Sequence, residues 1–220
     1  MMKNGVTGPL LIAFFLLTIG LYLVKPGGAA MTVGGNTAQT IAGLLAAVYL
    51  FRTALAFGKA DKVRPYWLWL AVGYVLNALG FLIYAFAELV LGPAVPSPSW
   101  ADLCWIASYP ALIYGSFALL RSYATSGLVV RVSKASWGAA IVVFLLAGYF
   151  LMWPIIADGE TGLLEKMVLL AYPVGDALLF AASFAVALMM RQFGAGKLGA
   201  PWTFIALGMI AATVSDMVYT

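Results

Sequence analysis

Apolar residues occur along this chain in long blocks, which short stretches of Gly, Pro, Ser and charged residues separate. A helix that crosses the hydrocarbon core of a bilayer needs about 20 mainly apolar residues, because each residue advances the helix by about 1.5 Å. Seven blocks approach or exceed this length, near residues 9–24, 38–58, 66–91, 101–123, 136–155, 164–191 and 202–219. The pattern predicts an all-α fold, a polytopic transmembrane helical bundle of about seven helices.

Composition supports the same prediction. Of the 220 residues, 64% are hydrophobic and only 9% are charged, whereas soluble domains carry about 25% charged residues. A water-soluble protein of this size needs more polar groups to cover its surface, but a bilayer tolerates an apolar exterior. We therefore expect residues 1–220 to form one transmembrane domain whose main partner is the lipid bilayer.

The first block, Pro9 to Val24, is the shortest, and it lies between Lys3 and Lys25 with small residues after it. A basic start, an apolar stretch and small residues are also the pattern of a cleaved signal peptide. The apolar core of a signal peptide usually has about 7–15 residues, fewer than this block has. A retained first helix is therefore the prediction, and cleavage is the alternative.

Basic and acidic residues fall on opposite sides of the predicted membrane. Ten of the 12 basic residues lie on one side, namely Lys3, Arg52, Lys59, Lys62, Arg64, Arg121, Arg131, Lys134, Arg191 and Lys197. Of the acidic residues, only Asp61 shares that side. Because cytoplasmic loops are enriched in Lys and Arg, we expect a cytoplasmic N-terminus in the cytoplasmic (inner) membrane of a prokaryote. The net charge of +4 then reflects topology and anionic lipid, not nucleic-acid binding.

Several blocks share local sequence features. Three of them begin with a tryptophan shortly after a basic residue, at Trp67, Trp137 and Trp202. Two of the returning blocks contain a Tyr-Pro pair, Tyr109-Pro110 and Tyr172-Pro173, at matched depth. These features predict a bundle built from two-helix hairpin repeats, at 66–121, 136–191 and 202–220. The alternative is that Trp and Arg recur at the interfaces of any membrane protein.

Three short motifs carry a resemblance to a known family. They are Pro96-Ser97-Pro98-Ser99-Trp100-Ala101-Asp102-Leu103 with Ser108-Tyr109-Pro110, Ala171-Tyr172-Pro173-Val174-Gly175-Asp176, and Val214-Ser215-Asp216-Met217-Val218-Tyr219. Over residues 66–220 the chain resembles the multi-helix N-terminal membrane sensor region of bacterial signalling proteins. In that family GGDEF and EAL domains, which make and break cyclic di-GMP, or a histidine kinase follow the membrane region. The resemblance implies a sensor portion truncated at Thr220, with signalling output in a cytoplasmic domain or partner subunit.

Asp176 lies near the middle of the sixth predicted helix. A carboxylate at that depth costs about 2.5–3.5 kcal/mol on insertion scales, so we expect it to face the bundle interior. The two prolines remove backbone hydrogen bonds and favour kinks that open a pocket to the outer side. The predicted ligand-binding residues are Asp176, Asp216, Tyr109, Tyr172 and Asn77. The alternatives are a protonated Asp176 that only locks helix packing, and simple structural bends at the prolines.

Asp102 is interpreted differently. Ser99 suits the N-cap of the fourth helix, and Asp102 follows three residues later, where its charge interacts favourably with the helix dipole. This spacing predicts a capping role.

Catalytic chemistry is not indicated. The chain has no histidine and one cysteine, Cys104, so ordinary zinc and haem sites and a Ser-His-Asp triad are not expected. We expect no catalytic residues, no metal and no cofactor. The predicted function is an integral membrane sensor or signal-transduction module that senses from the outer half of the membrane. The alternatives are a stand-alone structural subunit of a larger membrane complex, and a small cation- or proton-coupled transporter.

Overall fold

The computed structural model describes residues 7–24, 27–92, 95–125, 148–191 and 208. Within these ranges all regular secondary structure is helical, which confirms the all-α class there. The elements are α1 (Thr7–Val24), α2 (Gly28–Ala56), α3 (Arg64–Leu91), α4 (Trp100–Thr125), the π-helical turn η1 (Gly148–Met152), α6 (Trp153–Ala157) and α7 (Leu163–Arg191). Gly208 apart, the predicted seventh helix at 202–219, with Asp216, lies outside the described residues, as does most of the predicted helix at 136–155.

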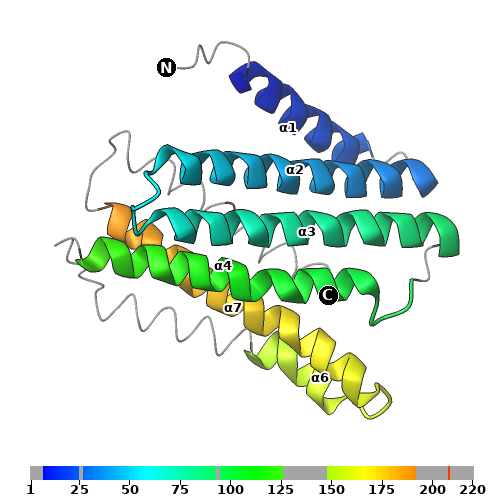
Figure 1. The fold of residues 1–220 in the computed structure, drawn as a ribbon. Helices are drawn as coiled ribbons and strands as arrows, with labels where there is room; N and C mark the ends of the chain where they lie inside the picture. The colour runs from blue at the N-terminus through cyan, green and yellow to red at the C-terminus, as the bar shows by residue number, and fades with distance from the viewer. Residues whose placement is uncertain (1–6, 25–26, 93–94, 126–147, 192–207, 209–220) are drawn as a thin grey trace.

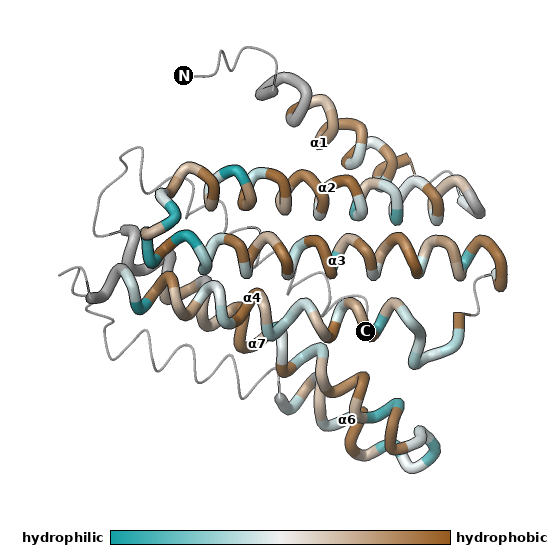
Figure 2. Tube along the Cα trace, viewed as in Figure 1, coloured by the Kyte–Doolittle hydropathy of each residue, from teal (hydrophilic) through white to brown (hydrophobic). Residues whose placement is uncertain are grey.

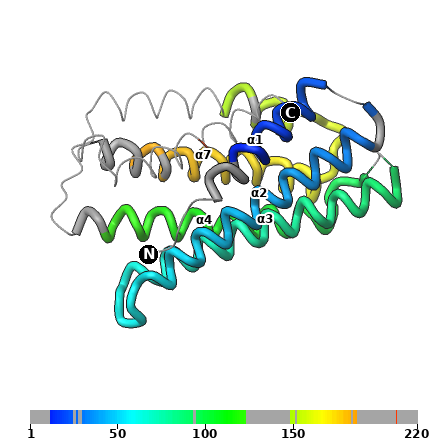
Figure 3. The backbone as a smooth tube through the Cα atoms, turned by 90° about the horizontal axis from the view of Figure 1, so that it is seen from above, coloured from blue at the N-terminus to red at the C-terminus, as the bar shows by residue number. Residues whose placement is uncertain are grey.

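Helices α2, α3 and α4 pack side by side, and α7 runs along α4 in the same direction (Figures 1 and 3). The loops between α2 and α3 and between α3 and α4 lie at opposite ends, so neighbouring helices are antiparallel (Figure 1). Three segments, Ala30–Ala56, Arg64–Leu91 and Trp100–Ser122, are long and apolar enough to cross a membrane. Figure 2 shows hydrophobic residues along most of the length of these helices.

The predicted boundaries hold within a few residues for α1, α3, α4 and α7, but α2 begins at Gly28 and not near residue 38. The early part contains Gly34, Gly35 and Asn36, which are typical of loops. Here the glycines let α1 approach, because a Cβ at Gly34 would lie 2.8 Å from Leu21. Tertiary packing therefore extends the helix through a sequence that local propensity does not favour.

Small residues allow close approach between the other helices as well. A Cβ on Gly73 would lie 2.5 Å from the Leu112 side chain, and one on Gly115 would lie 3.0 Å from the Tyr66 carbonyl oxygen. These contacts join α3 to α4 around a core of Ala54, Trp67, Leu70, Leu112, Leu119 and Leu179. Close packing at small residues is the usual way in which membrane helices associate, since lipid removes most of the hydrophobic driving force between them.

The charged residues of the described helices separate along the bundle. Lys59 and Lys62 lie in the loop between α2 and α3, and Arg121 lies in the last turns of α4 at the same end (Figure 1). Glu88 and Asp102 lie near the opposite end, beside the loop between α3 and α4. The charge asymmetry seen in the sequence is thus a difference between the two ends of the bundle.

The loop between α6 and α7 is organised by Asp158. Its carboxylate accepts hydrogen bonds from the Glu160 amide at 2.9 Å and from the Thr161 hydroxyl. Lys166 donates to the carbonyl oxygens of Ile156 and Asp158. The Thr161 hydroxyl, followed by the Glu160 amide, lowers the pKa of the Asp158 carboxyl below its ordinary value.

We predict that Gly115→Ala destabilises the bundle, because its new methyl group meets the Tyr66 carbonyl and Leu70. Overpacking of this kind costs about 1–3 kcal/mol. Thermal unfolding of the detergent-purified chain measures the effect. Gly20→Ala is the matched control, since a Cβ there meets nothing within 4 Å and alanine is the better helix former. Equal melting temperatures for the two variants would contradict the close α3–α4 contact.

We also predict that Thr161→Val raises the pKa of Asp158 toward 3.8, its ordinary value. A carboxyl with a lowered pKa stabilises the folded loop above its unfolded pKa, and this stabilisation is lost as pH falls through the folded pKa. The wild-type loop should therefore stay ordered to a lower pH than the variant. Titration of the Asp158 carboxyl carbon by NMR is the measurement, and identical titration curves would refute the assignment.

Candidate functional site

Two hydrogen bonds of the same kind join α4 to α7. The Tyr109 hydroxyl of α4 donates to Asp176 Oδ1 of α7 at 2.7 Å. The Tyr172 hydroxyl of α7 donates to Asp102 Oδ1 of α4. Each helix therefore supplies one tyrosine donor and one carboxylate acceptor, and we call these four residues the Tyr–Asp seam.

The two Tyr-Pro pairs of the sequence supply the tyrosines of the seam. Tyr109 and Tyr172 each precede a proline inside a helix, and the centroids of their rings lie 6.4 Å apart in an edge-to-face arrangement. Gly175 lets the α4 ring lie against the α7 backbone, because a Cβ there would lie 2.5 Å from Tyr109. The Tyr-Pro pairs thus lie opposite each other on two neighbouring helices.

Asp102 has two sets of partners. Its Oδ2 accepts from the Ser99 amide at 2.6 Å and from the Ser99 hydroxyl at 2.8 Å, which confirms the predicted capping role. Its other oxygen binds Tyr172, a contact that sequence reasoning missed. The sequence carries no local signal for this contact, because Asp102 and Tyr172 lie 70 positions apart.

Aromatic rings pack around the Tyr172 side of the seam. The Trp105 ring packs edge-on against Phe81 of α3 and Tyr172 of α7, with centroid distances of 5.3 and 6.5 Å. Its indole Nε1 is buried and has no hydrogen-bond partner within the described part of the chain. Gly80 accommodates the ring, since a Cβ there would lie 2.4 Å from Nε1. The cluster thus ties α3 to the seam through Trp105.

A further carboxylate, Glu88 of α3, joins α2 in the same way. Its Oε2 accepts from Asn36 Nδ2 at 2.9 Å, and its Oε1 accepts from the Thr32 hydroxyl at 3.2 Å. Sequence reasoning missed this site because Thr32 and Asn36 precede the helix that was predicted to begin near residue 38. Their spacing of four residues, one helical turn, was the available signal.

The structure brings three of the five predicted ligand-binding residues together, namely Tyr109, Tyr172 and Asp176. Asn77 is half-buried on α3 and makes no side-chain hydrogen bond to another described residue, so it is not part of the seam. Asp216 lies outside the described residues. Within the described ranges no group of three or more His, Cys, Asp or Glu side chains could hold a metal ion.

The chemistry of the seam is reversible hydrogen bonding. Neutral hydroxyl groups stabilise carboxylates in an apolar setting without an added charge. Hydrogen bonds between membrane helices contribute on average about 0.6 kcal/mol and at most about 1.7 kcal/mol. At these values, two such bonds would contribute about 1–3 kcal/mol to the contact between α4 and α7.

Comparison of the chain with protein-family models, curated proteins and solved structures finds no significant match.

We predict that Tyr109 and Asp176 are energetically coupled. In a double-mutant cycle of Tyr109→Phe and Asp176→Leu, the effects on stability should fall short of additivity by about 0.6–1.7 kcal/mol. Chemical denaturation in detergent micelles gives the four stabilities. Tyr149→Phe combined with Asp176→Leu is the control, because Tyr149 is exposed on η1. Strict additivity of the Tyr109 and Asp176 effects would show that the hydrogen bond contributes nothing.

Proposed function

We propose that the chain is a multi-pass protein of the prokaryotic cytoplasmic membrane that serves as a sensor or signal-transduction module without catalytic activity of its own. The Tyr–Asp seam is the observation on which the proposal rests. It would sense from the outer half of the membrane and pass a helix shift to a cytoplasmic output domain or partner subunit.

Three apolar helices of membrane length and an apolar exterior support the membrane location. Phe86 of α3 and Leu103 of α4, for example, are 69% and 59% exposed. Large apolar surfaces of this kind are normally covered by another molecule or by lipid. Lipid suits apolar helices of this length. The basic end carries Lys59 and Lys62, so it is the end that we place in the cytoplasm.

Energetics support sensing at the seam. The coupling between two sites in a switching protein is typically about 1–3 kcal/mol, which matches the stabilisation expected from two membrane hydrogen bonds. A ligand or membrane change that competes for Asp102 or Asp176 would therefore shift the α4–α7 contact substantially. Glycine contacts occur at both interfaces, Gly73 on Leu112 between α3 and α4 and Gly175 on Tyr109 between α4 and α7, but the paired Tyr and Asp groups lie between α4 and α7.

The resemblance of the Tyr-Pro and Asp motifs to bacterial membrane sensor regions favours an output in the cytoplasm. Parallel α4 and α7 both point their C-terminal ends toward the basic end (Figure 1). A shift at their outer contact would therefore reach that end along two continuous helices. Rearrangements of about 1–2 Å are typical of helix shifts in signalling proteins.

A proton- or cation-coupled transporter is the second candidate. Asp176, a half-buried carboxylate between two proline-containing helices, is the observation that favours it. Transport would require Asp176 to exchange its proton or cation between the two sides of the membrane. Proton or cation uptake that disappears in Asp176→Asn proteoliposomes would support the transporter over the sensor.

The sensor proposal predicts that release of the seam moves the basic ends of α4 and α7. Spin labels at Arg121→Cys and Ala181→Cys, both exposed, would be placed in a Cys104→Ser background and measured by pulsed EPR in proteoliposomes. Adding Tyr109→Phe and Tyr172→Phe should displace the distance population by about 1–2 Å or populate a second one.

Tyr114→Phe is the control for that experiment, because Tyr114 packs on Trp69 and Tyr66 of α3 and lies outside the seam. Superimposable distance distributions in all variants, with only a lower melting temperature for the double variant, would mean that the seam is a packing device.

A further inference from the structure

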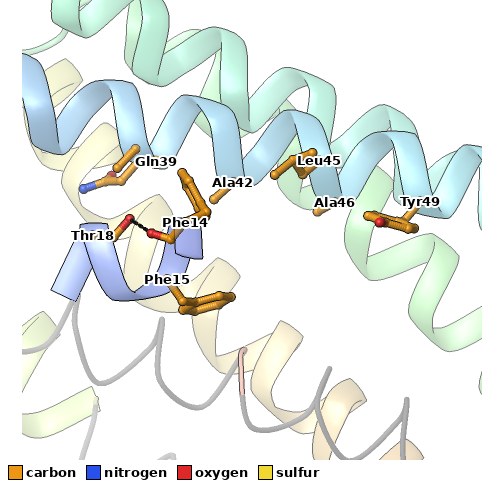
Figure 4. A pocket seen from close by; sticks show the side chains of 9 residues that line it. Phe14, Phe15, Thr18, Gln39, Ala42, Leu45, Ala46 and Tyr49 are labelled. Carbon is orange, nitrogen blue, oxygen red and sulfur yellow. Dashed lines mark hydrogen bonds between the residues drawn. The ribbon is translucent and has the colours of Figure 1, made fainter. Parts of the chain in front are cut away.

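The loop between α3 and α4 makes direct contact with the Tyr–Asp seam. Residues 96–98 of this loop are exposed, and the loop lies at the end of the bundle opposite the basic end (Figure 1). The apolar groove of about 320 Å³ between α1 and α2, by contrast, is lined by no residue of the seam (Figure 4). The loop is therefore a direct route from this end of the bundle to the contact between α4 and α7.

Ser99, the last residue of the loop, and Tyr172 of α7 bind different oxygens of the same carboxylate, that of Asp102. Oδ2 accepts from the Ser99 amide at 2.6 Å and from the Ser99 hydroxyl at 2.8 Å, whereas Oδ1 accepts from the Tyr172 hydroxyl. Asp102 is half-buried and has no other hydrogen-bond partner among the described residues. The donors therefore do not compete for one oxygen, and both sets can bind at once.

The bonds from Ser99 fix the direction of the Asp102 carboxylate. An aspartate side chain rotates about two bonds, and holding Oδ2 at the start of α4 restricts both of them while Oδ1 remains directed at α7. Immobilising a side chain costs conformational entropy. A donor that meets an acceptor already held in place pays less of that cost. The bonds of Ser99 and Tyr172 to Asp102 should therefore strengthen each other.

We propose that Ser99 is a positioning residue for the Tyr–Asp seam, through which Asp102 couples the α3–α4 loop to α7. Displacement of Ser99 frees the Asp102 carboxylate and weakens its bond with Tyr172. Loss of the Tyr172 bond loosens Ser99 by the same factor, because coupling between two sites is reciprocal. The inference rests on the proposed function, for which it names the α3–α4 loop as the place where an outer stimulus acts.

Amide hydrogen exchange at Ser99, followed by NMR of the full chain in detergent micelles, tests the coupling. Tyr172→Phe should reduce the protection of the Ser99 amide by about two- to tenfold, the effect of releasing one side chain. Tyr109→Phe is the matched control, because it removes the other hydroxyl of the seam, which binds Asp176 and not Asp102. Equal loss of protection in the two variants, or no loss in Tyr172→Phe, would overturn the proposal.

The reverse direction is tested by chemical denaturation. The effects of Ser99→Ala and Tyr172→Phe on the unfolding equilibrium constant should depart from additivity by about two- to tenfold. Those of Ser99→Ala and Tyr109→Phe should be additive. Ser99→Thr keeps both donors, so Tyr172→Phe should cost as much stability in that background as in the wild type. Additive effects of Ser99→Ala and Tyr172→Phe would refute the positioning role.

Failure of this coupling is distinguishable from failure of the sensor proposal. If the exchange result is negative while the EPR distances between α4 and α7 still shift, the seam moves but Ser99 does not position it. Coupling with unchanged EPR distances would support the role of Ser99 and refute the sensor. The exchange experiment keeps Ser99 in every variant, so its outcome does not depend on whether Ser99→Ala folds.

Discussion

Carboxylates on the apolar helices accept hydrogen bonds from neighbouring helices, and these contacts organise the bundle. Glu88 takes its donors from α2, Asp102 takes one from α7, and Asp176 takes one from α4. Each contact joins residues more than 50 positions apart in the chain. In water such bonds would add little, because solvent competes for both partners. In an apolar setting the alternative is an unsatisfied carboxylate, so the polar residues determine which helices are neighbours.

Close packing at glycines and hydrogen bonds between side chains both join the helices. Glycine-mediated contacts, as at Gly73 and Gly115, bring α3 and α4 close enough for dispersion forces to act along both helices. The Tyr–Asp seam adds two hydrogen bonds to the contact between α4 and α7, where Gly175 also packs on Tyr109 and Leu179 joins the core. In the proposed sensor, a shift between α4 and α7 would break and re-form these two bonds.

Much of the fold follows from the sequence, because block length and hydropathy are local properties. The starts of α3 and α4 were predicted within a few residues, since Pro65 and Ser99 are local helix-start signals. The start of α2 was not, because the loop-like run around Gly34 becomes helical only when α1 packs on it. Among site residues, Asp176 was recognised by its depth alone. Asp102 was interpreted only as a cap, because its cap partner is three residues away and Tyr172 is 70 residues away.

We propose that the bundle spans the membrane with Lys59 and Lys62 inside and the α6–α7 loop outside. Ala60 and Gly159 are exposed in loops at the two ends, so single cysteines there, in a Cys104→Ser background, report the side directly. A membrane-impermeant maleimide applied to spheroplasts should label Gly159→Cys at once and Ala60→Cys only after the membrane is permeabilised. Labelling of both positions in intact spheroplasts, or of Ala60→Cys alone, would contradict this orientation.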